Sequence, residues 1–160
     1  MSQKNQYITN LLRFAICLIY FFGGIVGLYV LFPLATNFTT SLLSITLFGF
    51  MVMQNLVAIY GSLTFFDKKP VGGRMLYWLS WTSVPVFSSE LISYHSIIGL
   101  GVVPLMRFEE GNYGMSLLFE FGYEGVIKWF PTHDIYQLGI NLVPLVFIGV
   151  IRQLINVNQD

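Results

Sequence analysis

Ser88, Ser89, Glu90 and His95 place hydroxyl, carboxyl and imidazole groups within one apolar segment of the chain. An ionisable residue at membrane depth is a functional hypothesis by default, because leaving it buried and unpaired costs at least about 2.5 kcal/mol. Glu90 and His95 lie five residues apart and could relay protons or bind a cation. A helix starting at Met75, however, has risen about 22 Å by Glu90 and has reached the headgroup region. We therefore favour a solvated carboxylate here, and we predict no metal site and no cofactor.

The same region suggests a hydrolytic site. Ser88 or Ser89 could meet His133 and Asp134 at the membrane interface, which would assemble the residue types of a nucleophilic triad. The sequence has no G-x-S-x-G elbow, no H-E-x-x-H and no Walker-type loop. Asp134 is explained equally well as a favourable charge at a helix N-terminus. We predict that the protein is not an enzyme, with a membrane-interface hydrolase as the less favoured alternative.

Polar and small residues inside the apolar segments have two interpretations. Gln54, Asn55 and Asn141 could line a polar pathway, but such amides more often form interhelical hydrogen bonds worth about 1 kcal/mol each. Gly23 and Gly27 are spaced four apart, a pattern that lets helices approach closely. We favour packing within the monomer over dimerisation, and a homo-oligomer remains the alternative.

The elements that position these residues are dominated by one uncharged stretch. No Asp, Glu, Lys, Arg or His occurs from Phe14 to Phe66. A hydrocarbon core of about 30 Å needs roughly 20 helical residues, so this stretch predicts two crossings, at 14–34 and 41–66. The composition agrees, since 55% of residues are hydrophobic, 10% are charged and the mean hydropathy is +0.69. We predict an integral membrane protein that forms a single domain over residues 1–160.

Two further spans are predicted at 75–94 and 134–152, which gives a mainly α fold with a four-helix transmembrane bundle. Between them, residues 96–131 form short β-rich runs punctuated by glycines, and Glu109 to Gly114 resemble a hairpin turn. From Ser116 onward, apolar and polar residues alternate with period two, which indicates a strand. We predict a small β-rich module outside the cytoplasm, between the third and fourth helices.

The distribution of charge predicts the orientation, because Lys and Arg are concentrated in cytoplasmic loops. With four spans, six of the eight basic residues fall on one side: Lys4, Arg13, Lys68, Lys69, Arg74 and Arg152. Six of the eight acidic residues fall at or beyond the opposite interface. We predict a multi-pass protein of the cytoplasmic (inner) membrane with both termini in the cytoplasm. No Lys/Arg-rich run suggests nucleic acid as a partner.

The external module is the favoured functional element. A sheet this small must lean on the helices or on a partner, and aromatic residues are common anchors of protein interfaces. We predict that it binds a protein partner, as an accessory or inhibitory factor such as a toxin-immunity protein. The candidate partner-binding residues are Glu109, Glu110, Tyr113, Phe119, Glu120, Phe121, Tyr123, Glu124 and Trp129. The alternative is a small oligomeric channel or transporter subunit that uses Glu90 and His95.

Overall fold

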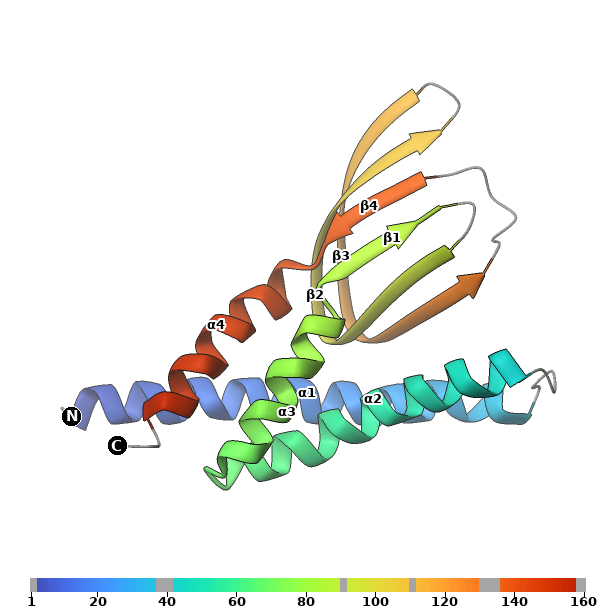
Figure 1. The fold of residues 1–160 in the computed structure, drawn as a ribbon. Coiled ribbons are helices and arrows are strands. Elements are labelled where there is room, and N and C mark those ends of the chain that lie inside the picture. Colours follow the sequence, from blue (N-terminus) through green and yellow to red (C-terminus); the bar gives the residue numbers. More distant parts are fainter. Residues whose placement is uncertain (1–2, 37–41, 90–91, 110–111, 130–135, 158–160) are drawn as a thin grey trace.

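Four helices and one four-stranded antiparallel sheet make up the structure, a computed structural model that describes residues 3–36, 42–89, 92–109, 112–129 and 136–157 (Figure 1). The elements follow one another along the chain as α1 Gln3–Thr36, α2 Leu42–Phe66, α3 Pro70–Thr82, β1 Pro85–Ser88, β2 Ile92–Glu109, β3 Asn112–Trp129, β4 Tyr136–Ile140 and α4 Leu142–Val157. The helices and the sheet are not segregated in sequence, because all four strands lie between α3 and α4.

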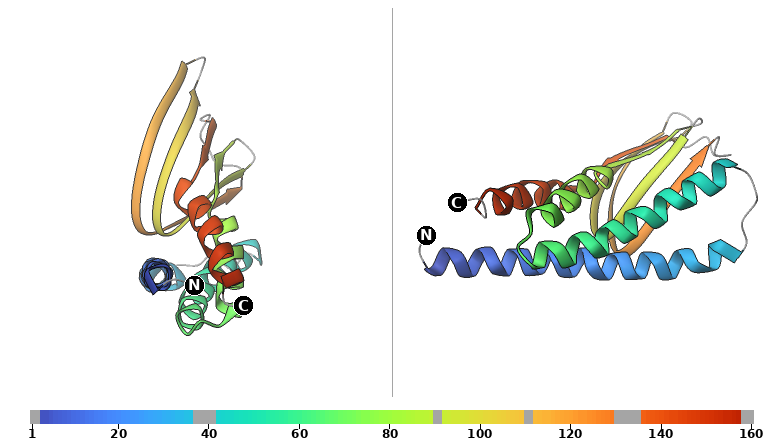
Figure 2. Two further views of the ribbon diagram at one scale, coloured as in Figure 1. Left: turned by 90° about the vertical axis from the view of Figure 1, so that its left-hand side faces the viewer. Right: turned by 60° about the horizontal axis from the view of Figure 1, so that its bottom comes forward.

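The two long helices match the first two predicted crossings. α1 contains the predicted segment 14–34 and extends back to Gln3, since nothing from Gln3 to Arg13 interrupts a helix. α2 begins at Leu42 and ends at Phe66, close to the predicted 41–66. The helices lie side by side and antiparallel, with α3 and α4 against one end of the pair (Figure 2). The hydroxyl groups of Tyr20 and Ser80 share a hydrogen bond of 2.7 Å that joins α1 to α3.

The predicted third span, 75–94, is wrong. α3 starts earlier, with Pro70 at its first turn, and ends at Thr82 after 13 residues. Pro85 explains the end, because a proline disfavours helical geometry at the preceding residue and has no N–H to continue the ladder. It instead occupies the first position of β1, where a proline is tolerated. Tyr94 and His95 therefore lie on β2, not on a helix.

The predicted fourth span, 134–152, is also only partly helical. Tyr136–Ile140 form β4, and α4 begins at Leu142 and runs for 16 residues. A helix of that length rises about 24 Å, less than a hydrocarbon core of about 30 Å. Among the described residues, two helices are long and apolar enough to cross a membrane, within 6–33 and 45–66. The predicted four-span bundle is thus not supported.

The sheet is larger than the predicted β-rich module at 96–131. β2 and β3 pair over their whole lengths, from Ile92 opposite Trp129 to Glu109 opposite Asn112, so the predicted hairpin is present. β1 and β4 add two short strands from outside the predicted module, in the order β1-β4-β2-β3. β1 also pairs with the first part of β2, while β4 pairs with the last part, so the sheet curls back on itself (Figure 1).

Two glycines let the long hairpin bend. Gly99 and Gly122 are directly opposite each other in the register, and their φ angles are +94° and +111°. Such angles suit glycine because it has no Cβ. At this bend the hairpin meets α1, where a Cβ added to Gly23 would collide with the backbone nitrogen of Gly99. The sheet is therefore fixed to the helices by a backbone-to-backbone contact.

Candidate functional site

The two faces of β3 carry different kinds of side chain. One face carries Tyr113, Met115, Leu117, Phe119 and Phe121, as the period-two pattern predicts. The other face carries Leu118, Glu120 and Glu124, with Gly122 between the two carboxylates. The five apolar side chains on the first face are all exposed and occupy every second position of the strand. The second face includes two carboxylates. The two faces form two separate candidate sites.

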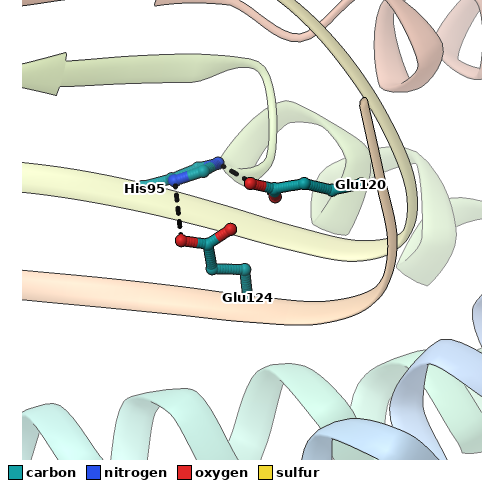
Figure 3. A group of neighbouring side chains, drawn as sticks. All are labelled: His95, Glu120 and Glu124. Carbon is teal, nitrogen blue, oxygen red and sulfur yellow. Dashed lines mark ion pairs between the residues drawn. The ribbon is translucent and has the colours of Figure 1, made fainter. Parts of the chain in front are cut away.

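On the carboxylate face, His95 lies between Glu120 and Glu124 (Figure 3). Its Nε2 atom is 3.6 Å from Oε2 of Glu120, and its Nδ1 atom is 3.7 Å from Oε1 of Glu124. The exposed fractions of the three side chains are 13%, 17% and 45%, in the order His95, Glu120 and Glu124. The group is thus mostly enclosed and opens to solvent at Glu124.

The bend in the hairpin brings this group together. Glu120 and Glu124 are four residues apart on β3, and in a straight strand their Cα atoms would be about 13 Å apart. Gly122 lies midway between them, so the bend turns both carboxylates toward the imidazole on β2. In the register Glu124 pairs with Ile97, two residues from His95, and so lies on the same face. The cluster depends on sheet register and on Gly122 rather than on any local motif.

Burial shifts the pKa values of Glu120 and His95 in the directions that favour their uncharged forms. Burial, together with the neighbouring Glu124 carboxylate, raises the pKa of Glu120 to about 8. Burial lowers the pKa of His95, and the Glu124 carboxylate opposes that shift. The Nε2 atom of His95 and the Oε2 atom of Glu120 are buried and have no hydrogen-bond partner among the described residues. The arrangement therefore holds two polar atoms close together without satisfying either.

The opposite face of the hairpin carries an apolar stripe, which we define as Tyr113, Met115, Leu117, Phe119 and Phe121. Their exposed fractions run from 54% to 83%. Met106 is opposite Met115 in the register and also opposite Leu138 on β4, so the stripe continues across three strands. Beside it, a hollow of about 320 Å³ is lined by Pro104, Met106, Met115, Leu138, Ile140 and Leu142. Stripe and hollow form one apolar surface.

The predicted partner-binding residues are divided between the two faces. Tyr113, Phe119 and Phe121 belong to the apolar stripe. Glu120 and Glu124 face His95, so they are not rim charges of the apolar surface. Tyr123 is half-buried and packs against the main helical core. Glu109 ends β2 and is exposed, whereas Glu110 and the side chain of Trp129 lie outside the described residues.

The predicted intramembrane polar residues take part in packing. Gln54 donates to Oγ1 of Thr82 and accepts from the hydroxyl of Ser96, so it links α2 to α3 and β2. Asn55 donates to the carbonyl of Met51 on its own helix. Its side chain also lies directly against Gly27 of α1.

The remaining predicted residues belong to the third and fourth predicted spans. Asn141 is fully buried and precedes α4 instead of lying within it. His95 is on β2, and Glu90 lies outside the described residues, so the structure does not place the two side chains together. Ser88 and Ser89 follow one another at the end of β1, whereas His133 and Asp134 also lie outside the described residues.

The convergence of His95 with Glu120 and Glu124 is the feature that the sequence did not reveal. The carboxylates are 25 and 29 residues from the histidine, and only the pairing of β2 with β3 joins them. A signal was present in the alternation of β3, which already placed both carboxylates on one face. No protein-family model matches the chain, and neither curated proteins nor solved structures give a match.

Proposed function

We propose that this protein is held in a membrane by α1 and α2 and binds another protein through the apolar surface of its sheet. The helices supply the first part of the argument. The apolar windows of α1 and α2 are only 39% and 28% buried inside the protein, whereas the core helices of soluble proteins are mostly buried. Their exposed side chains include Phe22, Tyr29, Leu56 and Leu63. Hydrocarbon would cover such surface without any polar mismatch.

The charged groups favour one orientation for this anchor. The start of α1, the connection from α2 to α3 and the end of α4 lie at the same end of the molecule (Figure 1). Arg13, Lys68, Lys69, Arg74 and Arg152 belong to these segments. The sheet lies away from them, beyond the other ends of α3 and α4 and beside α1 (Figure 1). Under the rule that cytoplasmic segments are rich in Lys and Arg, the helix ends face the cytoplasm. For the sheet to face outward, α3 and α4 must then pass through the membrane together with α1 and α2.

The single observation that carries the binding proposal is the apolar stripe beside an open strand edge. A contiguous exposed apolar surface marks a site for a protein or a membrane. In the described part of the chain, β3 pairs with β2 alone, so the N–H and C=O groups along the other edge of this 18-residue strand have no strand partner. Hydrocarbon cannot satisfy those groups, whereas a strand from another protein can. We therefore favour a protein over lipid as the occupant.

The chemistry of the surface describes the partner. It would add an extended segment along β3 and place apolar side chains against Phe119, Phe121 and the hollow near Met106. A partner held in this way has a strand of its own captured, which suits an accessory or inhibitory role. The transport alternative has less support, because Gln54 is already hydrogen-bonded within the bundle and His95 lies on the sheet.

A photocrosslinking amino acid placed along β3 tests the proposal in intact cells. Incorporation at 117, 119 and 121 should give one discrete adduct with another protein, identified by mass spectrometry. Incorporation at 118, whose side chain faces the other side of the sheet, is the matched control and should give none. With the purified partner, the change of both Phe119 and Phe121 to Ser should weaken binding at least roughly thirtyfold, as expected for aromatic anchors. Adducts with lipid alone, or with a second copy of the chain, would contradict the proposal.

A further inference from the structure

We propose that His95, Glu120 and Glu124 bind one divalent transition-metal ion, for which zinc is the best match. The inference does not depend on partner binding, since the cluster lies on the opposite face of the hairpin from the apolar stripe. It also departs from the sequence-based expectation of no metal site, which considered His95 only together with Glu90.

The spacing of the ligand atoms fits a shared ion better than direct contact. The 3.6 Å between Nε2 of His95 and Oε2 of Glu120 is too long for a hydrogen bond, which would be about 2.7–3.2 Å. Two ligands of one tetrahedral zinc ion, each bonded at about 2.0–2.2 Å, lie roughly 3.3–3.6 Å apart. One ligand atom from each of the three residues lies within 4.8 Å of the others. Glu124 lies 3.7 Å from Nδ1 of the imidazole rather than from Nε2. Closure around an ion bound to Nε2 and Glu120 therefore needs the more exposed Glu124 side chain to swing toward that ion.

The unsatisfied atoms provide a second and independent reason. Nε2 of His95 and Oε2 of Glu120 are buried and have no hydrogen-bond partner among the described residues. Buried polar atoms are nearly always satisfied by protein, water or an ion. Two neighbouring carboxyl groups also resist ionisation together unless a cation lies between them. A bound divalent ion satisfies both atoms and neutralises both carboxylates at once.

The backbone holds the three ligands in place. His95 and the two carboxylates project from paired strands, and Gly122 bends β3 between the carboxylates. Its partner in the register, Gly99, is packed against Gly23 of α1. A site on such a supported sheet keeps its ligand geometry better than a site on a loop. The position of α1 therefore helps to set the distance between the ligands.

The donor set selects the class of metal. One imidazole nitrogen and two carboxylate oxygens suit zinc and its first-row neighbours, whereas magnesium and calcium prefer oxygen donors alone. A metal selected by thiolates is excluded from this group of ligands, because the single cysteine, Cys17, lies on α1 and is not part of the cluster. Three protein ligands leave a fourth position of a tetrahedral ion for water or an incoming group.

Zinc binding to the purified full-length protein tests the proposal. Protein stripped of metal with a chelator is titrated with zinc chloride in competition with a chromogenic zinc indicator, and one equivalent should bind. His95→Ala and Glu120→Gln should each lower the affinity at least roughly a hundredfold, and Glu124→Gln at least roughly tenfold. Glu109→Gln on the same hairpin and His133→Ala, which removes the chain's second histidine, are the matched controls and should bind as the wild type does. An unchanged affinity in His95→Ala would overturn the proposal.

A spectroscopic measurement on the wild-type protein guards against variants that simply misfold. X-ray absorption of the zinc-loaded protein should show a first shell of nitrogen and oxygen only, with the outer-shell pattern of one imidazole. A sulfur ligand, or two imidazoles, would place the ion elsewhere and contradict the assignment. Failure of the wild type to bind zinc at about 100 µM, far weaker than protein zinc sites usually are, would also overturn it.

Discussion

Asn141 shows how a single residue joins segments that are distant in sequence. It is fully buried, and its Oδ1 atom accepts from the backbone N–H of Val102 on β2 at 3.2 Å and of Val143 in α4 at 3.3 Å. The backbone N–H of Asn141 donates to the carbonyl of Val84 at 2.8 Å. The bond to Val143 makes Asn141 the N-cap of α4. The residue therefore fixes the point at which the sheet becomes a helix.

Replacement of Asn141 by Ala should lower the free energy of unfolding by about 2–4 kcal/mol. The change removes the helix cap and leaves the N–H of Val102 without its acceptor, and these losses are about 1 kcal/mol and 1–3 kcal/mol respectively. Thermal unfolding in detergent, followed by circular dichroism, measures the effect. Asn156→Ala, at an exposed position near the end of the same helix, is the control and should change the free energy by less than about 0.5 kcal/mol. Equal effects of the two changes would contradict this role of Asn141.

Asn141 also shows which contacts of a single residue can be predicted from the sequence. An asparagine directly before an apolar helical run is an N-cap signal, and on that ground α4 could have been started at Leu142. The sequence analysis instead predicts a longer helix, 134–152, which includes the residues of β4. The contact with Val102, 39 residues earlier, cannot be read from either segment. Local chemistry predicts the cap, and only the fold gives its second partner.

At the scale of elements, the prediction succeeded where one local pattern decides the outcome. α2 is defined by an uncharged apolar run, and its observed ends lie within a residue of the predicted ones. β3 is defined by alternation of its side chains. The predicted span 75–94 covers both α3 and β1, because the polar residues from Pro85 onward are compatible with a polar helix. Pro85 ends the helix instead, and β1 then pairs with β2 and with β4, which is distant in sequence.

The packing of α1 on the sheet gives a prediction with opposite signs at two glycines. A Cβ at Gly23 would collide with the Gly99 backbone, which cannot move aside as a side chain can. Gly23→Ala should therefore lower the free energy of unfolding by about 1–3 kcal/mol, the usual range for overpacking. A Cβ at Gly49 of α2 meets nothing within 4 Å. Gly49→Ala should raise the free energy by about 0.5–1 kcal/mol, because alanine favours a helix over glycine.

Chemical denaturation of the two variants in the same detergent checks this pair. Both changes add one methyl group to a helical glycine, so their effects on helix propensity are the same. A difference in the sign of the change in unfolding free energy therefore comes from the atoms around each glycine. A stabilising effect at Gly23 would mean that α1 and β2 are not in contact. It would also remove the support that this contact gives to the bend at Gly99 and Gly122.

At the scale of the whole molecule, the number of crossings and the orientation of the sheet are linked. The count of four crossings is not supported, because α3 has 13 residues and α4 has 16. Two crossings by α1 and α2 return the chain to the side on which it began, and the sheet follows them in the chain. The basic helix ends and the sheet fall on opposite sides only when α3 and α4 also carry the chain through the membrane. The proposed orientation is therefore a prediction about α3 and α4 as well as about α1 and α2.

Cysteine labelling tests this orientation on the intact protein. Cys17, the single native cysteine, is buried in α1 and is first replaced by Ala. Tyr113→Cys then introduces a thiol on the sheet, at a position 83% exposed, and Lys69→Cys introduces one between α2 and α3, where the side chain is 63% exposed. A membrane-impermeant maleimide should label the cysteine at 113 in intact cells and the one at 69 only after the membrane is opened. The reverse pattern would place the sheet in the cytosol, and labelling of both or of neither in intact cells would place the sheet on the same side as the connection from α2 to α3.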